Sequence, residues 1–582
     1  MKSLLYMVTM GAVFVSLSVA ETTVELRTAM SPPAWALAER ALLKAYSDAA
    51  AEFTAKYVDD RGFFRCIERW GGNDGPDDVM ETFTPWTLLY ALGAPESVLA
   101  QYRRIWEGHL QQFTSAKAPS ASMAKDGMFY REFVTSFDWE HTGEGLAAFH
   151  LYALADPEDG MYVRRMRRFA GMFNGEDGEA PNYDKQHKII RSLHNGSKGP
   201  LLTPATVFDW GGETVAGHPE RHERYKAAAN IKGDHPLNLA ACSLGFNAFA
   251  LTGEKKYRDW LLEYAGAWRD RVMANGGNVP TNIGLDGVMG SEWGGKWYGG
   301  TFGWNFDPST SGRNYYMRGC RIAFGEAFLL TGDRSFVEPL RRQIANLYAV
   351  KKEERGRILL PNKHGEQGWY GYTPGQHFDV QRDIYLWLMD EADKKYLGSD
   401  GWIQFLDGKN AEYPVKALQG DFERLQRRLE AMRADKSTAD TRPSDGAQRY
   451  SPVETDTLVN LMLGGNDPGK SGNVLHARLR YFDPVGRRAG LPEDVAALVE
   501  KIGPEAVTVT LVNTNAVAAR EVVVQTGAYA EHRLTGVEWN GGKMAASGTS
   551  FRVRLAAGAG GKLTVGMKRY ANAPTAAFPW NR

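Results

Sequence analysis

One short unit recurs along the chain, and it constrains the fold more than any other feature. Each copy has an apolar segment, a tight turn and an amphipathic segment, and four of the turns begin at Ala91, Ala153, Ala250 and Leu329. Small and apolar residues on most faces of the first segment, as in LNLAACSLGFNAFAL, predict a helix that is buried on all sides. The second segment carries Arg, Lys and Glu on one face, which predicts an outer helix that faces water.

Repetition of such helical hairpins predicts a mainly α-helical protein built as an (α/α) toroid of about five or six hairpins. The ring is expected over residues 34–397, with a further inner helix that begins near Phe378. Two insertions, 175–232 and 276–313, interrupt the series of helical hairpins, and the second is rich in Gly and Trp. Long loops of this kind usually form lids or binding loops, so the irregular period favours an enzyme over a regular binding solenoid.

The pattern changes after residue 397. Residues 398–500 are interpreted as a helical and linker region, because a charged helix is followed by a polar stretch that contains proline. Residues 501–571 alternate apolar and polar side chains between turns of Gly and Asn. This alternation predicts a small C-terminal antiparallel domain that resembles a β-sandwich.

The first 20 residues predict a cleavable signal peptide. Lys2 precedes an apolar run from Leu4 to Leu17, and the small residues up to Ala20 form a cleavage site. The segment from Val24 to Pro33 is interpreted as a linker. No later segment approaches the roughly 20 uninterrupted apolar residues of a membrane span. The sequence therefore predicts a secreted or periplasmic protein without a membrane-spanning helix.

Composition narrows the choice of partners. The 582 residues include 69 basic and 69 acidic side chains, so no net field recruits nucleic acid or an anionic membrane. Cys66, Cys242 and Cys320 are far apart and odd in number, which excludes a disulfide framework; one disulfide or three buried thiols remain. The 16 Trp and 25 Tyr are many, and several stand in Gly-rich loops. Flat rings with a polar atom suit the faces of sugars, although most of them belong in the core.

In a toroid the loops that precede the inner helices meet at one mouth, and these loops and the insertions are rich in acid–base and aromatic side chains. The candidate catalytic residues are Asp138, Glu140, His141, His187, His235, Tyr315, Tyr316 and His377. The candidate substrate-binding residues are Trp139, Arg191, Asn195, Trp293, Trp297, Tyr298, Trp304, Asn314 and Arg318. Helix N-termini at the mouth favour a bound carboxylate or sulfate, so the predicted substrate is an acidic poly- or oligosaccharide.

Structural roles stand beside these functional ones. Asp138 precedes a helix and is suited to cap it, and His141 is suited to close its loop by a hydrogen bond. The alternation from His187 to Arg191 is typical of a hairpin. The sequence predicts no cofactor and no metal ligands; Ca²⁺ at residues 73–78 is the alternative, although their spacing is not that of an EF-hand. No serine-hydrolase, nucleotide-binding or zinc-protease motif occurs in a supporting context.

With this architecture, the chain resembles polysaccharide lyases of the alginate- and heparinase-like type, and equally the toroid glycoside hydrolases that act on unsaturated uronides. The resemblance covers about residues 34–397 and lies in the architecture. For a lyase it implies β-elimination, in which Asn314, Arg318 or Arg191 neutralises a uronate carboxylate. The base would be His187, His235 or His377, and the acid Tyr315, Tyr316 or Tyr183. The chain lacks the NNHxYW-like signature of one alginate-lyase group, and its β domain is shorter than the sheets that many toroid lyases carry.

A hydrolase would instead need two carboxyl groups about 5 to 9.5 Å apart. Asp138 or Glu140 with Asp77 or Asp78 could supply them. The sequence favours the lyase slightly, because the Arg, Asn, His and Tyr set has no role in a minimal hydrolase. A noncatalytic glycan-binding protein ranks last, since the loops of such a protein would be similar to one another and these all differ.

Overall fold

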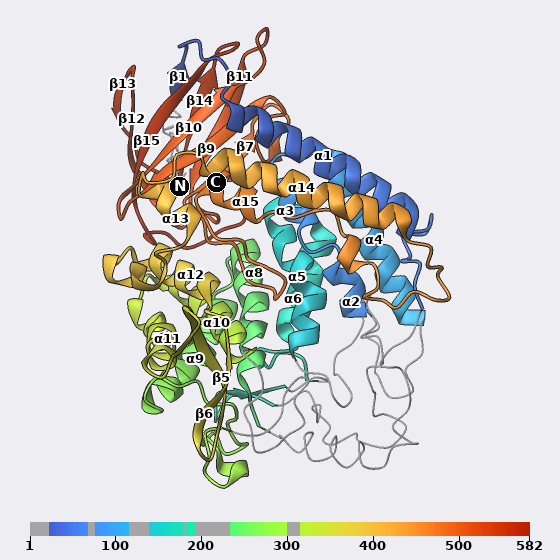
Figure 1. The fold of residues 1–582 in the computed structure, drawn as a ribbon, viewed down its shortest axis with the longest axis vertical. Helices are drawn as coiled ribbons and strands as arrows, with labels where there is room; N and C mark the ends of the chain where they lie inside the picture. Colours follow the sequence, from blue (N-terminus) through green and yellow to red (C-terminus); the bar gives the residue numbers. More distant parts are fainter. Residues whose placement is uncertain (1–22, 68–75, 116–138, 179–181, 192–232, 299–314) are drawn as a thin grey trace, which may run out of the picture.

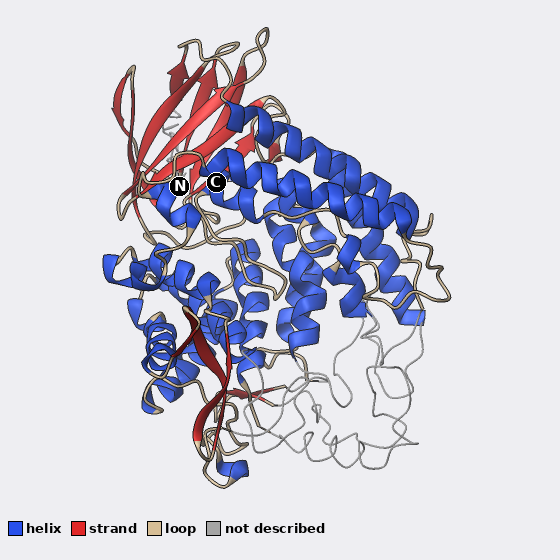
Figure 2. Cartoon of the chain, viewed as in Figure 1, coloured by secondary structure: helices blue, strands red, loops and turns tan. Residues whose placement is uncertain are grey.

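The computed structural model describes residues 23–67, 76–115, 139–178, 182–191, 233–298 and 315–582. The described chain is mainly helical, and its two large sheets gather in a separate region formed largely by the C-terminal part of the sequence (Figures 1 and 2). The predicted signal peptide, residues 1–20, lies outside the described residues. In the described part of the chain, no helix is long and apolar enough to cross a membrane.

The recurring unit forms consecutive helical hairpins, as the sequence predicts. The pairs are α3 (Trp86–Leu92) with α4 (Glu96–Ser115), α5 (Trp139–Ala155) with α6 (Gly160–Gly171), α8 (Cys242–Thr252) with α9 (Lys255–Ala274), and α10 (Tyr315–Thr331) with α11 (Glu338–Ala349). Turn residues explain the sharp corners. Asp159 caps α6 by accepting hydrogen bonds from the backbone N–H groups of Met161 and Tyr162, and Gly253 ends α8 with a φ of 70°.

The first helix of each pair belongs to a buried inner layer. All residues of α8 from Cys242 to Ala250 are buried, whereas α9 exposes one face. Successive inner elements contact one another: α2 (Pro76–Glu81) and α3 contact α5, and α5 and α10 both contact the 3₁₀-helix η2 (Pro236–Ala241). The approach of α10 to η2 requires glycine, because a Cβ on Gly319 would lie 2.0 Å from the carbonyl oxygen of Pro236. A further inner helix, α12 (Phe378–Leu388), begins where the sequence predicts it.

Two long helices, α1 (Ala34–Tyr57) and α14 (Tyr413–Ala434), lie side by side (Figure 1). After α14, the segment 437–478 crosses the inner layer, and we call it the crossing segment. Ser451 donates a hydrogen bond to the carbonyl of Thr82 beside α2, and Asn466 donates one to Asp383 of α12. The crossing segment therefore joins the first and last inner helices of the series. It includes η6 (Gln448–Tyr450), α15 (Asp456–Leu458) and η7 (Val459–Leu463).

Two five-stranded sheets make up the β region. Their strand orders are β1-β14-β11-β7-β8 and β13-β12-β15-β10-β9. The strands are β1 (Thr23–Leu26), β7 (Leu479–Asp483), β8 (Arg488–Ala489), β9 (Val495–Ile502), β10 (Ala506–Asn513), β11 (Arg520–Thr526), β12 (Arg533–Trp539), β13 (Gly542–Ala545), β14 (Ser550–Leu555) and β15 (Gly560–Lys568). All pairs are antiparallel except β1 with β14.

The β region differs from the sequence prediction at both ends. Its strands begin at Leu479 rather than at residue 501, and the predicted linker from Val24 contributes β1. The strand β9 was missed because Val495 to Val499 form a continuous buried run instead of alternating. The strand packs against α1 and η7, so both of its faces are covered, and a short apolar run of this kind does not distinguish strand from helix.

Smaller elements complete the described chain. The sheet β4 (Lys352–Glu354), β5 (Arg357–Gly365) and β6 (Gly368–Thr373) is an unpredicted insertion between α11 and α12, apart from the two large sheets (Figure 2). The strands β2 (Tyr183–Asp184) and β3 (Ile189–Ile190) form a short hairpin. The three cysteines are free and buried, which confirms the choice of buried thiols over a disulfide.

Candidate functional site

Many of the predicted site residues lie at or beyond the edge of the described chain. Asp138, Asn195, Trp304 and Asn314 lie outside the described residues. Trp139, Glu140 and His141 begin α5, Tyr315 and Tyr316 begin α10, and Asp77 lies in α2, but the structure describes only the backbone of these residues. Their roles in a site stay predictions.

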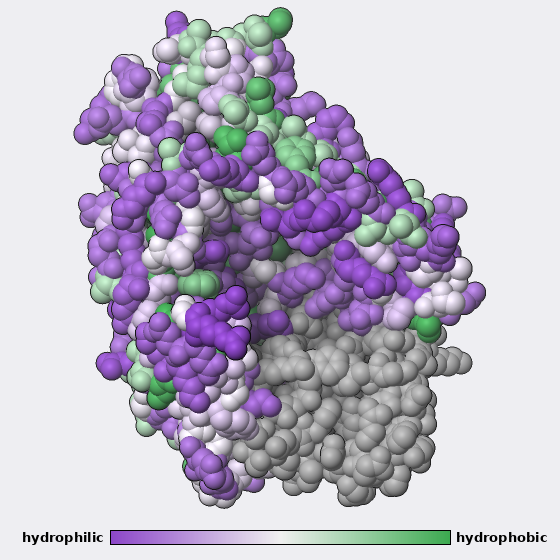
Figure 3. Space-filling model, in the orientation of Figure 1, coloured by the Kyte–Doolittle hydropathy of each residue, from purple (hydrophilic) through white to green (hydrophobic). Residues whose placement is uncertain are grey.

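The described part of the predicted mouth is formed by α10, α12 and the crossing segment. The helices α2, α5 and α10 begin directly after segments 68–75, 116–138 and 299–314, which are outside the described residues. The loop before α12, by contrast, is described and ends at His377. On the face shown in Figure 3, the surface is hollowed near its centre, and the visible residues around the hollow are mainly hydrophilic.

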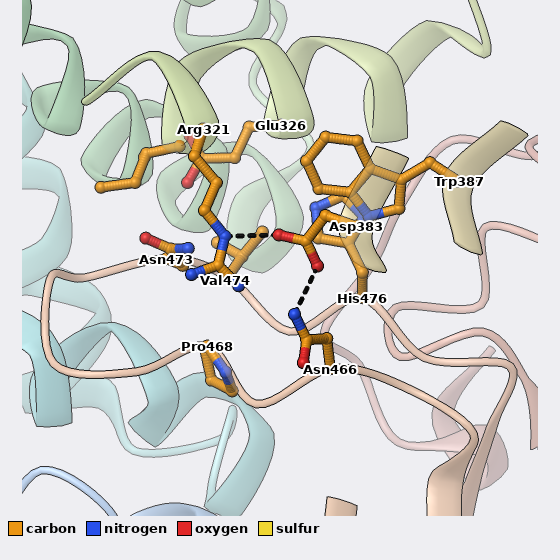
Figure 4. A pocket seen from close by; sticks show the side chains of 10 residues that line it. Arg321, Glu326, Asp383, Trp387, Asn466, Pro468, Asn473, Val474 and His476 are labelled. Carbon is orange, nitrogen blue, oxygen red and sulfur yellow. Dashed lines mark hydrogen bonds and ion pairs between the residues drawn. The ribbon is translucent and has the colours of Figure 1, made fainter. Parts of the chain in front are cut away.

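Arg321 of α10 lies at the centre of a charged cluster (Figure 4). It donates hydrogen bonds to the carboxylates of Asp383 and Asp379 on α12, and the Nη1 to Oδ2 distance to Asp379 is 3.0 Å. Asn466 of the crossing segment donates to the other oxygen of Asp383 at 2.9 Å, and Arg321 also reaches the carbonyl of Asp467 at 3.4 Å. We call Arg321, Asp379, Asp383, Asn466 and Asp467 the Arg321 cluster.

The two aspartates of α12 differ in exposure although they share one arginine. The side chain of Asp383 is 5% exposed, and that of Asp379 is 56% exposed. Burial raises the pKa of Asp379, but Arg321, the N–H of Val380 and His377 outweigh burial and leave this pKa below its ordinary value. Asp379 is thus a half-exposed carboxylate that can meet a ligand in its ionised form.

Asp467 has the opposite electrostatic environment. Burial and the neighbouring carboxyl of Asp456 raise the pKa of Asp467 to about 6, although Thr455 donates a hydrogen bond to it at 2.7 Å. Two like charges at close range cannot both ionise easily, so one of the two carboxyls retains its proton to a higher pH. The cluster therefore holds a carboxylate that ionises readily and a carboxyl that retains its proton to a higher pH than an ordinary aspartate.

His377 is the predicted catalytic residue that lies nearest to this cluster in the sequence. It precedes α12 with a φ of 53°, a left-handed conformation that a residue with a side chain rarely adopts. Burial lowers the pKa of its half-buried imidazole, which therefore stays neutral at neutral pH. Arg318, another predicted residue, is half-buried on α10, one turn before Arg321.

His187 and Arg191 lie on a different element, the β2–β3 hairpin. Nδ1 of His187 is 3.1 Å from a carboxylate oxygen of Asp184, and Arg191 is 3.9 Å from the same oxygen. The carbonyl of His187 accepts a hydrogen bond from Arg271 of the outer helix α9. Tyr183 donates to Glu263 of α9 at 2.8 Å, so this hairpin packs on the outer layer.

His235 is fully buried directly before η2, next to Asp234, whose carboxylate accepts many hydrogen bonds and which we call the Asp234 hub. The Asp234 carboxylate accepts hydrogen bonds from the backbone of Ile190 and His235 and from the side chains of Asn238, Tyr264 and Trp268, all at 2.8 to 3.1 Å. This set ties the β2–β3 hairpin, η2 and α9 together, which is a structural task.

The predicted aromatic residues of the Gly-rich insertion contact rings on a second insertion, the β5–β6 hairpin. The ring of Trp297 lies 4.5 Å from that of His364 and 6.0 Å from that of Trp369, and Tyr298 lies 4.7 Å from His364. All four rings are half-buried, as is Trp293 in the 3₁₀-helix η3 (Ser291–Trp293). The β5–β6 hairpin thus contributes two of these four rings, whereas the sequence predicted aromatic residues only on the Gly-rich insertion.

The residues named for calcium are only partly described. Asn73 and Asp74 lie outside the described residues, and Asp78 accepts a hydrogen bond from Ser444 at 3.0 Å. Within the described ranges, no group of three or more His, Cys, Asp or Glu side chains is arranged to hold a metal ion.

The Arg321 cluster itself was absent from the predicted catalytic and binding residues. One signal did exist in the sequence: Arg318, Arg321 and Glu326 interrupt an inner helix that otherwise has no charged side chain, in MRGCRIAFGEAFLL. A charged side chain in a helix buried on all sides needs a partner, and the partners of Arg321 lie 58 or more residues away.

Fold and cluster together define a double-layered helical-hairpin protein with a separate β region. The chain belongs to the family described as "Domain of unknown function (DUF8034)", whose model matches residues 23–399 and 391–459. Among solved structures, it is similar to a cellobiose 2-epimerase from Bacillus thermoamylovorans B4167, with 12% identity and a TM-score of 0.30 over 60% of this chain and 100% of the epimerase chain. No curated protein matches the sequence.

Proposed function

We propose that the protein is a glycan-cleaving enzyme of the (α/α) toroid type, and that it hydrolyses glycosidic bonds with Asp379 and Asp467. Asp379 acts as the ionised carboxylate, and Asp467 donates a proton to the leaving oxygen. The observations that carry this proposal are that Arg321 contacts both residues, the carboxylate of Asp379 and the backbone carbonyl of Asp467, and that the pKa of Asp379 is lowered whereas that of Asp467 is raised. Such a divided pair supplies the base or nucleophile and the acid that glycoside hydrolysis needs.

The position of the crossing segment supports the assignment of these residues to an active-site cleft. The crossing segment bonds to Thr82 next to α2 and to Asp383 in α12, so it spans the gap between the first and last inner helices. Asp379 lies in the first turn of α12. The aromatic surface of Trp297, Tyr298 and Trp369 supports a sugar as the ligand.

The charges of the Arg321 cluster favour hydrolysis over β-elimination. A lyase needs a cation or amide that is free to neutralise the uronate carboxylate. Arg321 is only 12% exposed, and its guanidinium already bonds to two carboxylates. An acidic substrate would also meet Asp379 at its exposed edge, so the cluster favours a neutral or weakly acidic glycan over a polyuronate.

β-Elimination is the second candidate, and His377 is the observation that favours it. A neutral imidazole beside the cluster is able to accept the proton alpha to a uronate carboxylate. In this mechanism the acid is one of the predicted tyrosines, Tyr315 or Tyr316.

The test is incubation of the protein with a panel of neutral glycans and polyuronates, with two readouts on each sample. New reducing ends without ultraviolet absorbance support the hydrolase, whereas absorbance of an unsaturated uronyl product supports the lyase. The variants D379N and D467N are each expected to lower kcat by about 10²–10⁴-fold. The matched control is D48N, at an exposed aspartate of α1. The hydrolase proposal fails if both variants cleave as fast as D48N.

A further inference from the structure

The hydroxyl group of Ser243 in α8 lies within hydrogen-bond distance of two oxygen atoms from other parts of the chain. Oγ of Ser243 is 2.6 Å from the carbonyl oxygen of Gly472 in the crossing segment, and 2.5 Å from Oε1 of Glu326 in α10. Oxygen atoms approach this closely only when a proton lies between them. Both contacts are therefore hydrogen bonds, and each needs its own proton.

The proton count determines the ionisation state of Glu326. A serine hydroxyl carries one proton, and a backbone carbonyl is only an acceptor, so Ser243 must donate to Gly472. The second proton then comes from the carboxyl group, and Glu326 must donate to Ser243. Glu326 is therefore an un-ionised carboxylic acid in the folded protein.

The surroundings of Glu326 agree with this count. Glu326 is 1% exposed. With Trp387 and Val474 it lines a cavity of about 10 Å³, which has room for about one water molecule (Figure 4). Burial raises the pKa of Glu326 well above its ordinary value. The other titratable groups that face it are Arg321 of α10, Asp383 of α12, Cys242 of α8, His476 of the crossing segment and Tyr529 of the β region.

The consequence concerns the crossing segment. The Ser243 bridge holds its Gly472, and its Val474 lines the same small cavity as the Glu326 carboxyl group. The same segment carries Asn466 and Asp467 a few residues before Gly472, and His476 two residues after Val474. We propose that Glu326 is a positioning residue which, as an un-ionised acid, clamps the crossing segment against α8 and α10 and so holds Asp467 in the Arg321 cluster. The part that concerns Asp467 rests on the proposed function.

Infrared difference spectroscopy tests the ionisation state directly at pH 7. Wild type minus E326Q is expected to show the carbonyl band of an un-ionised carboxylic acid. The matched control is E538Q, at an exposed glutamate of β12. Its difference spectrum is expected to show carboxylate bands. Carboxylate bands for Glu326 as well would overturn the inference.

The pH dependence of unfolding gives a second readout. The unfolded chain releases the Glu326 proton near its ordinary pKa of 4.5, whereas the folded chain retains it. Relative to E326Q, the unfolding equilibrium constant of wild type should therefore rise about tenfold per pH unit above that value. The stability contribution is complete at low pH and is lost as the pH rises. A ratio that does not change with pH contradicts an un-ionised Glu326.

Hydrogen exchange tests the clamp without any assay of activity. The backbone amides of residues 466–476 are expected to exchange faster in E326A and S243A than in wild type, and E326Q is expected to restore protection, because its amide N–H can donate to Ser243. Equal exchange in E326A and E326Q overturns the clamp. If the proposed hydrolase activity exists, kcat follows the same order. Absence of that activity contradicts the proposed function, whereas the infrared and exchange results still decide the role of Glu326.

Discussion

Replacing Asp383 with asparagine tests the charge arrangement around Arg321. The substitution removes a negative charge that is 5% exposed and faces a guanidinium that is 12% exposed. Breaking a buried ion pair by removing one partner costs about 3–5 kcal/mol, because the other charge is left uncompensated. Arg321 keeps Asp379 at 3.0 Å, so the expected cost of D383N lies at the lower end, about 3 kcal/mol.

The matched comparison is D379N, which removes a carboxylate from the same arginine. The side chain of Asp379 is 56% exposed, and exposed ion pairs contribute about 0–1 kcal/mol. Urea unfolding at pH 7, followed by far-ultraviolet circular dichroism, measures both variants against wild type. The reasoning predicts that D383N unfolds at a clearly lower urea concentration than D379N. Equal midpoints, or a larger loss in D379N, would refute the claim that Asp383 holds the buried half of the network.

Three further predictions follow from other contacts. Nη1 of Arg569 donates to the carbonyl of Trp387 at 2.7 Å at the end of α12, so R569M should destabilise the protein by about 1–3 kcal/mol in the same urea assay. D234N converts one of the two acceptor oxygens in the Asp234 hub into a donor that faces other donors, and about 3 kcal/mol should be lost; a change below 1 kcal/mol would contradict the structural role of Asp234. The Asp467 pKa of about 6 predicts that activity falls as the pH rises through that value. D456N removes the neighbouring charge and should move this fall in activity to lower pH. An unchanged pH profile would assign the fall to another group.

Local sequence patterns were sufficient to predict the helical hairpins. Burial of the first helix, amphipathicity of the second and the turn residues between them are all encoded within a few neighbouring positions, so the start of α12 near Phe378 was also predictable. The onset of the β region was not, because β9 is apolar on both faces and its partners lie in η7 and α1. The β5–β6 hairpin lacks a strong apolar alternation and was missed as well.

The candidate site was less predictable than the fold, because its chemistry depends on partners that are distant in sequence. His187 and His235 stood in conspicuous local patterns, but the structure places one on an outer hairpin and buries the other beside the Asp234 hub. Arg321, by contrast, forms the cluster by bonding to Asp383, which is 62 residues away. Asp383 in turn accepts a hydrogen bond from Asn466, which is 83 residues away. No local pattern shows that these three meet.

The most direct test of the central claim compares the D379N and D467N variants on two substrates that differ only in the leaving group. On a natural glycan, loss of either carboxyl should lower kcat by about 10²–10⁴-fold. On an aryl glycoside with a strongly acidic phenol, which needs no protonation to depart, D467N should recover most of the wild-type rate and D379N should not. Equal recovery of both variants, or wild-type rates in D379N on the natural glycan, would contradict the assignment of Asp379 and Asp467 as the catalytic pair.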